Sequence, residues 1–117
     1  MTVLVAVPDS AEGRAALSAA GEEARHRSAD LVVINLGLDP LDPDALPADV
    51  PVSVRARSGP DLVDSVLTTL DEHEGRVDLL VIGLKRRTPV GKALLGSVSQ
   101  QLLLEAEVPI LAVKPER

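Results

Sequence analysis

The chain has 117 residues and no cysteine, and 18 acidic residues against 12 Lys and Arg give it a net charge of −6. This length fits one domain with a sizeable core, and the lack of cysteine excludes disulfides, a thiol nucleophile and thiolate ligands for zinc. The acidic balance argues against nucleic-acid binding. We therefore expect one domain over residues 1–117, without a metal site and without a nucleic-acid partner.

The apolar runs are short, which bears on where the protein resides. Residues 2–7 have no basic segment before them and meet Pro8 too early for a signal peptide. No run approaches the roughly twenty apolar residues that a membrane span needs. The sequence therefore predicts a cytoplasmic protein with no membrane partner.

The first elements are two strands with a helix between them. Residues 2–7 are β-branched or small and apolar, and residues 31–36 are apolar apart from Asn35, which is typical of strands buried on both faces of a sheet. Asp9 and Ser10 can cap a helix, which we expect to run from Ala11 to about Arg27. Its apolar face is small and can lie close to a sheet; it consists of Ala16, Leu17, Ala20 and Ala24.

Residues 37–49 contain three prolines and four aspartates, which predicts a loop or one short turn in place of a full helix. The aspartate spacing does not match a calcium-binding loop, so we interpret the segment as a solvated crossover. The next strand, residues 50–57, alternates apolar and polar residues. Because it contains Pro51 and outward charges, it belongs nearer an edge of the sheet.

The second half repeats the alternation of helices and strands. A helix is expected from Gly59-Pro60-Asp61 to near Gly75, and another over residues 97–106 with Val98, Leu102 and Leu103 facing inward. Residues 77–82 and 108–113 are the fourth and fifth apolar strands. The pattern predicts an α/β fold: an open five-stranded parallel sheet with helices on both faces.

A basic segment with glycines at both ends joins the fourth strand to the last helix. Residues 79–104 hold four basic residues and no acid, whereas residues 1–78 carry a net charge of −9. Gly96 and Ser97 precede the helix, where backbone N–H groups lack partners and attract an anion. The segment predicts an anion site. The alternatives are a solvated charged surface and, for Ser97, a plain N-cap in a capping box with Gln100.

The ends of two strands are expected to meet at this site. In open parallel sheets, ligands bind outside the carboxyl ends of the strands, where the winding direction reverses. Polar residues or glycine follow the strands 2–7 and 77–82. We therefore expect both ends to lie in one crevice.

Together these segments resemble the universal stress protein family. The resemblance covers nearly the whole chain and rests on residues 3–7 with Ser10, residues 78–83, residues 95–98 and residues 108–114. It implies a Rossmann-like fold related to the adenine-nucleotide α-hydrolases. It also implies a regulatory role in stress response, with ATP or a related adenine nucleotide, accompanied by Mg²⁺, as the ligand.

ATP-binding members of that family carry Gly, two residues, Gly, nine residues, Gly and then Ser or Thr. Gly83, Gly96 and Ser97 match the first, third and last positions, while Arg86 replaces the middle glycine. Pro8 stands where those members have an aspartate, with Asp9 directly after it. The resemblance implies nucleotide contacts from Pro8, Asp9, Ser10, Leu36, Ile82, Gly83, Arg86, Arg87, Gly96, Ser97 and Val98.

The substitutions Pro8 and Arg86 leave two functions open. A guanidinium can hold phosphate bidentately, with Arg87 and Lys92 nearby, which would preserve a nucleotide-binding regulatory dimer. Alternatively, the loss of the glycine prevents close backbone approach, and the protein is an interaction dimer that binds no nucleotide. Hydrolysis would require a positioned base, for which Asp9 is the only candidate, so we do not expect an enzyme.

The family resemblance also implies a homodimer. Residues 108–113 are apolar, and as an uncovered edge strand they would be a template for pairing with another chain. The implied contact is antiparallel pairing of this strand with its copy across a two-fold axis. Because Pro109 has no N–H, pairing should be centred on residues 110–113. A regulatory protein is the second expected partner.

Overall fold

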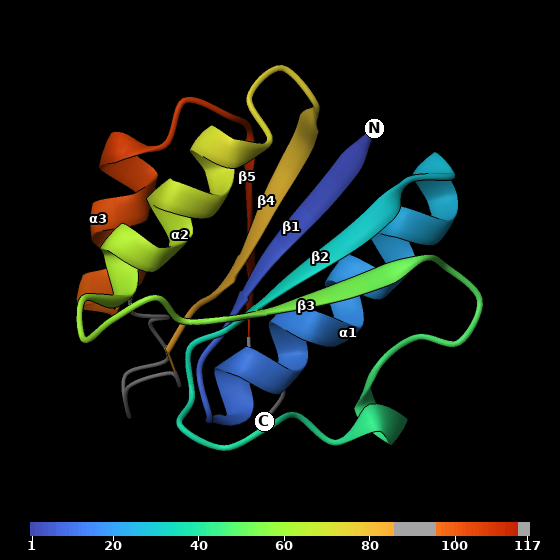
Figure 1. The fold of residues 1–117 in the computed structure, drawn as a ribbon, viewed down its shortest axis with the longest axis horizontal. Coiled ribbons are helices and arrows are strands. Elements are labelled where there is room, and N and C mark those ends of the chain that lie inside the picture. Colours follow the sequence, from blue (N-terminus) through green and yellow to red (C-terminus); the bar gives the residue numbers. More distant parts are fainter. Residues whose placement is uncertain (86–95, 115–117) are drawn as a thin grey trace.

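The computed structural model describes residues 1–85 and 96–114, which form one five-stranded sheet (Figure 1). All pairings are parallel, and the strand order is β3-β2-β1-β4-β5. This confirms the predicted open parallel sheet, with β3 at one edge as expected and β5 at the other. The strands are β1 (Thr2–Val7), β2 (Asp30–Asn35), β3 (Val52–Ala56), β4 (Val77–Gly83) and β5 (Ile110–Val113).

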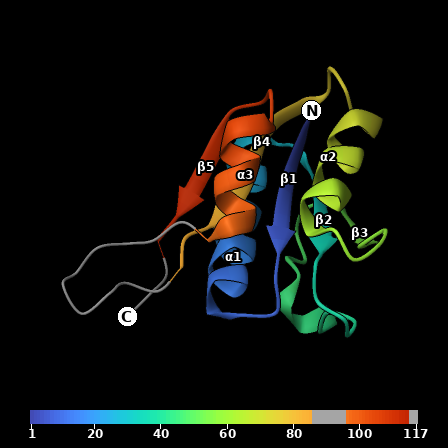
Figure 2. The same ribbon diagram turned by 90° about the vertical axis from the view of Figure 1, so that its left-hand side faces the viewer.

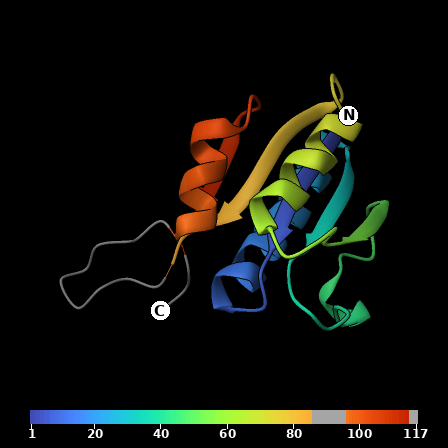
Figure 3. The same ribbon diagram turned by 60° about the vertical axis from the view of Figure 1, so that its left-hand side comes forward.

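Helices cover both faces of the sheet, as predicted. Helix α1 (Ala11–Arg27) lies on one face, and α2 (Leu62–Glu72) and α3 (Ser97–Glu105) lie side by side on the other (Figures 2 and 3). The apolar side chains form two buried clusters, one between α1 and the sheet and one beneath α2 and α3. No helix within residues 1–85 and 96–114 is long and apolar enough to cross a membrane.

Helix α1 lies close to the sheet because its inner face is small. Ala16, Ala20 and Ala24 are fully buried on it. At its start the Ser10 hydroxyl accepts a hydrogen bond from the Gly13 N–H at 3.3 Å, which satisfies one of the unpaired donors of the first turn. The predicted capping residue and helix bounds are therefore confirmed.

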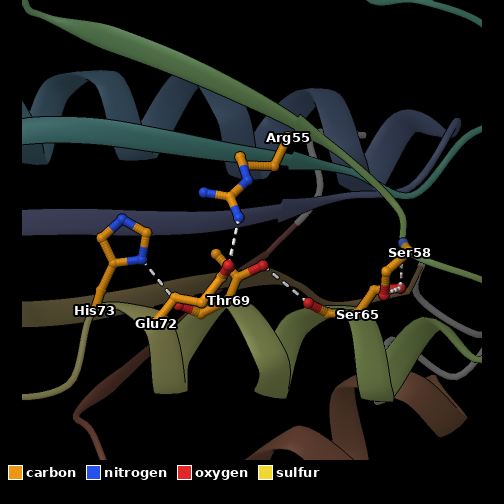
Figure 4. A network of polar contacts seen from close by, with 6 residues as sticks. All are labelled: Arg55, Ser58, Ser65, Thr69, Glu72 and His73. Carbon is orange, nitrogen blue, oxygen red and sulfur yellow. Dashed lines mark hydrogen bonds and ion pairs between the residues drawn. The ribbon is translucent and has the colours of Figure 1, made fainter.

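Helix α2 faces the sheet with two buried polar side chains whose partners are local (Figure 4). The Ser65 hydroxyl accepts a hydrogen bond from the Ser58 N–H at 3.0 Å, and the Thr69 hydroxyl donates to the Ser65 carbonyl at 2.9 Å. On the surface, Arg55 of β3 pairs with Glu72. These contacts satisfy the buried polar groups and fix the helix against the end of β3.

The proline segment between β2 and β3 contains only the single-turn 3-10 helix η1 (Pro43–Ala45), as predicted. Its apolar residues Leu41 and Leu46 pack against the core cluster beneath α1. Arg25 of α1 pairs with Asp49 and holds the segment to the helix. The segment thus covers the part of the sheet that α1 leaves open.

One expectation for α3 was wrong. Leu103 does not face inward and is 48% exposed, whereas Leu102 is fully buried. Successive helical residues are about 100° apart, so Leu102 contacts the core and its neighbour turns away. The alternative interpretation of Ser97 as an N-cap in a capping box does not hold either, because Gly96 is the N-cap and Ser97 is the first helical residue.

The bounds of β5 also differ from the expectation. The strand begins at Ile110, later than the predicted Val108, although the Pro109 carbonyl already accepts a hydrogen bond from the Leu80 N–H at 2.9 Å. Proline lacks an N–H to continue the ladder. The regular strand therefore starts one residue after it.

Candidate functional site

The winding direction of the sheet reverses between β1 and β4. From β1 the chain proceeds through β2 to β3 on one side, then crosses to β4 and β5 on the other. Strands β1 and β4 are adjacent, with Val5 opposite Val81, so their carboxyl ends lie together as predicted. A pocket of about 150 Å³ opens at this place. It is where open parallel sheets bind ligands.

The pocket has a largely apolar floor and a polar rim. Ala6, Ile82 and Leu102 form buried parts of its lining, together with Leu36 at the end of β2. An apolar floor of this kind suits a flat, weakly polar group such as a nucleobase. The polar or charged residues of the lining are Glu12, Lys85, Ser97 and Ser99.

The structure brings most of the predicted site residues together. Those that line the pocket are Pro8, Leu36, Ile82, Gly83, Gly96, Ser97 and Val98. Asp9 and Ser10 are outside this lining: Ser10 caps α1, and Asp9 is exposed beside Gly37. Arg86 and Arg87 lie outside the described residues. Contact of any of these residues with a ligand stays a prediction.

Gly83 is required by the packing of α1 against the end of β4. A Cβ atom at this position would lie 2.3 Å from the Glu12 carbonyl oxygen, far inside contact distance. The carboxyl end of β4 therefore meets the first turn of α1 directly. The packing of α1 therefore explains the glycine at this position, whether or not Gly83 also contacts a ligand.

The start of α3 forms another part of the pocket wall. Its N-cap, Gly96, provides no side-chain hydrogen bond to the first-turn N–H groups. The Ser99 hydroxyl donates to the Gly83 carbonyl at 3.1 Å and so ties the helix start to β4. A nine-residue helix held with its N-terminus at a pocket favours an anion there, through the N–H groups of its first turn and its dipole.

Sequence reasoning missed several lining residues, namely Ala6, Glu12, Leu62, Lys85, Ser99 and Leu102. The sequence held local signals for two of these residues: Lys85 lies in the basic segment, and Glu12 lies in the first turn of the helix that follows β1. No local signal in the sequence indicated that Leu62 and Leu102 would line the pocket. They reach the pocket because α2 and α3 pack side by side over the sheet.

The described residues offer no metal centre of their own. Within residues 1–85 and 96–114, no three His, Asp or Glu side chains are grouped so that they could hold an ion. Glu12 is the only carboxylate in the pocket lining given by those residues.

Comparisons with known proteins agree with this architecture. A sequence model of the universal stress protein family matches residues 72–114. The chain is 42% identical over 118 residues to a universal stress protein of Mycolicibacterium smegmatis, covering 88% of this chain and 89% of that protein.

Solved structures share the fold at lower sequence identity. A universal stress protein from Archaeoglobus fulgidus superposes with a TM-score of 0.72 at 24% identity, covering 97% of this chain and 98% of that one. The structure of the Archaeoglobus fulgidus protein in complex with dAMP gives a TM-score of 0.69 at 23% identity, with coverage of 97% and 98%. A universal stress protein in complex with cAMP gives 0.66 at 22% identity, with coverage of 97% and 96%. With the close relative and the shared fold together, the chain belongs to the universal stress protein family.

Proposed function

We propose that this protein is a small cytoplasmic regulator that binds an adenine nucleotide, ATP or AMP, in the pocket between the carboxyl ends of β1 and β4. The observation that carries the proposal is the pocket itself, which joins an apolar floor to the open N-terminus of α3 at the reversal point of the sheet. Structures of similar fold in complex with dAMP and cAMP support the choice of ligand class.

The two walls of the pocket suggest how a nucleotide would lie. The base would rest on the apolar floor near Leu36 and Ile82, and the phosphates would face Gly96 and Ser97 at the start of α3. A volume of about 150 Å³ is below the roughly 300–1,000 Å³ of typical ligand pockets. Part of the nucleotide would therefore lie outside it. From the sequence alone, Arg86 and Arg87 are candidates for phosphate contacts. Mg²⁺ would be held chiefly by the phosphates themselves.

Binding without rapid chemistry fits the lining best. Hydrolysis needs a positioned base, and Asp9, the candidate indicated by the sequence, does not line the pocket. The nucleotide would act by changing the surface that a partner protein meets. We expect the regulated partner to respond to the occupied and empty forms differently.

A second candidate function is an interaction dimer of the same fold that binds no nucleotide. Pro8 favours it, because this residue lines the pocket without a side-chain hydrogen-bonding group where nucleotide-binding relatives have a carboxylate. In both candidates we propose that the partner is a second copy of this chain, paired along the free edge of β5.

Mass spectrometry under non-denaturing conditions distinguishes the two candidates. The purified protein should carry, or take up when supplied, one adenine nucleotide per chain. Titration with ATP, AMP and cyclic AMP, followed by calorimetry, then gives the preferred ligand. An unliganded mass together with no heat of binding at millimolar nucleotide would reject nucleotide binding in favour of the interaction dimer.

A further inference from the structure

Two charged side chains of opposite sign stand on different walls of the pocket. Glu12 belongs to the first turn of α1, and its backbone lies directly over Gly83. Lys85 follows β4, and its aliphatic chain lies beside Gly96, with Cε 2.9 Å from where a Cβ of that residue would be. The pocket therefore has an acidic wall at α1 and a basic wall at the start of α3.

Glu12 is the only acidic residue in the described lining of the pocket. Pro8 contributes no side-chain donor or acceptor, and Asp9 lies beside Gly37, outside the lining. Glu12 is partly buried and lies in the first turn of α1. A carboxylate accepts hydrogen bonds from hydroxyl groups but repels phosphate, so this wall suits the neutral, hydroxyl-bearing part of a ligand.

We propose that Glu12 selects the sugar of the bound nucleotide by accepting hydrogen bonds from the ribose hydroxyls. The inference rests on the proposed function, because it names a specificity determinant of that same pocket. Lys85 completes the arrangement by drawing the phosphate to the start of α3, where the helix dipole adds to its charge. The opposite charges thus set the direction in which the nucleotide lies and favour ribonucleotides over deoxyribonucleotides.

Calorimetric titration of the full chain with four compounds tests the assignment: AMP, 2′-deoxy-AMP, 3′-deoxy-AMP and adenosine. We expect the parent protein to bind AMP at least about tenfold more tightly than either deoxy compound, the ratio expected when a charged hydrogen bond is lost. Glu12→Ala should weaken AMP binding by a similar factor. The variant should then bind AMP and the two deoxy compounds with equal affinity. Glu22→Ala, which removes an exposed acid from the same helix, is the matched control and should change none of these affinities.

Lys85→Met keeps the aliphatic chain beside Gly96 and removes only the charge. It should weaken AMP binding without changing the affinity for adenosine. Equal binding of AMP and both deoxy compounds by the parent would overturn the role of Glu12, as would an equal loss for all ligands in Glu12→Ala. Both results leave nucleotide binding intact. A parent protein that binds none of the four compounds would instead reject the proposed function.

Discussion

Two glycines on the inner face of α1 have different neighbours, and the difference shows how closely this helix approaches the sheet. A Cβ at Gly13 would lie 1.9 Å from the Pro8 carbonyl oxygen, whereas a Cβ at Gly21 would lie 3.4 Å from the Pro47 ring, an ordinary contact. The backbone after β1 therefore touches the helix start directly. That contact holds the pocket wall that contains Pro8 and Glu12.

Gly13→Ala and Gly21→Ala should change stability in opposite directions. Alanine is the better helix former by up to about 1 kcal/mol, so Gly21→Ala should raise the free energy of unfolding by at most that amount. At Gly13 the clash with the Pro8 carbonyl outweighs propensity, and a loss of about 1–3 kcal/mol is expected. Urea denaturation of both variants provides the comparison. Stabilisation by Gly13→Ala would show that the approach is looser than described.

Ser10 was predicted as a nucleotide contact, and the structure gives it a capping role. Ser10→Ala should cost about 1 kcal/mol of stability, because the Gly13 N–H loses its acceptor, while Ser10→Asp should retain most of it. Nucleotide affinity should be the same in both variants. Loss of affinity without loss of stability would show that Ser10 also contacts the nucleotide.

The strands and helices could be predicted from the sequence because apolar runs and capping residues are local signals. The bounds of β1 and α1 agree with the predicted ones for this reason. The orientation of α3 did not follow, because a nine-residue helix with three consecutive leucines fits more than one apolar face. The pocket was predictable where strands end, at Pro8 and Gly83, but not where helices from distant segments meet, at Leu62 and Leu102.

The proline segment depends on its ion pair with α1, and this dependence should vary with pH. The hydrogen bond from Arg25 lowers the pKa of Asp49 below its ordinary value. A carboxylate with a lowered folded-state pKa stabilises the fold above its unfolded-state pKa, and the contribution is lost as the pH falls through the folded-state value. Asp49→Asn should therefore be less stable than the parent at neutral pH.

The difference between parent and Asp49→Asn should disappear in acid. Because Arg25 and Asp49 are both exposed, this difference in stability should be small and should also decrease in high salt. Thermal unfolding between neutral pH and pH about 2 measures it, since the reference pKa of aspartate is about 3.9. A stability difference that persists in acid would mean that Asp49 stabilises the fold through something other than its charge.

For the whole molecule, the register of β5 specifies which backbone groups are free for a partner. The Pro109 carbonyl accepts a hydrogen bond from Leu80 of β4, and the Val113 carbonyl accepts one from Leu84, directly after β4. Alternate residues, Ile110 and Ala112, therefore direct their backbone groups away from β4. On α3, Leu103 and Leu104 are 48% and 78% exposed. The described part of the molecule therefore offers outward backbone groups on β5 and exposed apolar side chains on α3.

Ala112→Pro tests the proposed dimer without removing a hydrogen bond to β4. Proline deletes one N–H from the open edge, so the dimer dissociation constant should rise at least about tenfold. Ala112→Val keeps that N–H and should dimerise like the parent. Light scattering at tens of micromolar measures both, with circular dichroism as the control for folding. A monomeric parent, or an Ala112→Pro variant that dimerises equally tightly, would show that the β5 edge is not the interface.

Binding of adenine nucleotide to the pocket is the central claim, and calorimetric titration of Gly96→Val beside the parent tests it most directly. The added side chain meets mainly the movable end of Lys85, so the fold should persist, as thermal unfolding would verify. It also stands at the start of α3, where the phosphate would approach. We expect the parent to bind AMP or ATP and Gly96→Val to lose at least about tenfold in affinity, the value of a charge-assisted contact. Equal affinity in the two folded proteins would contradict it.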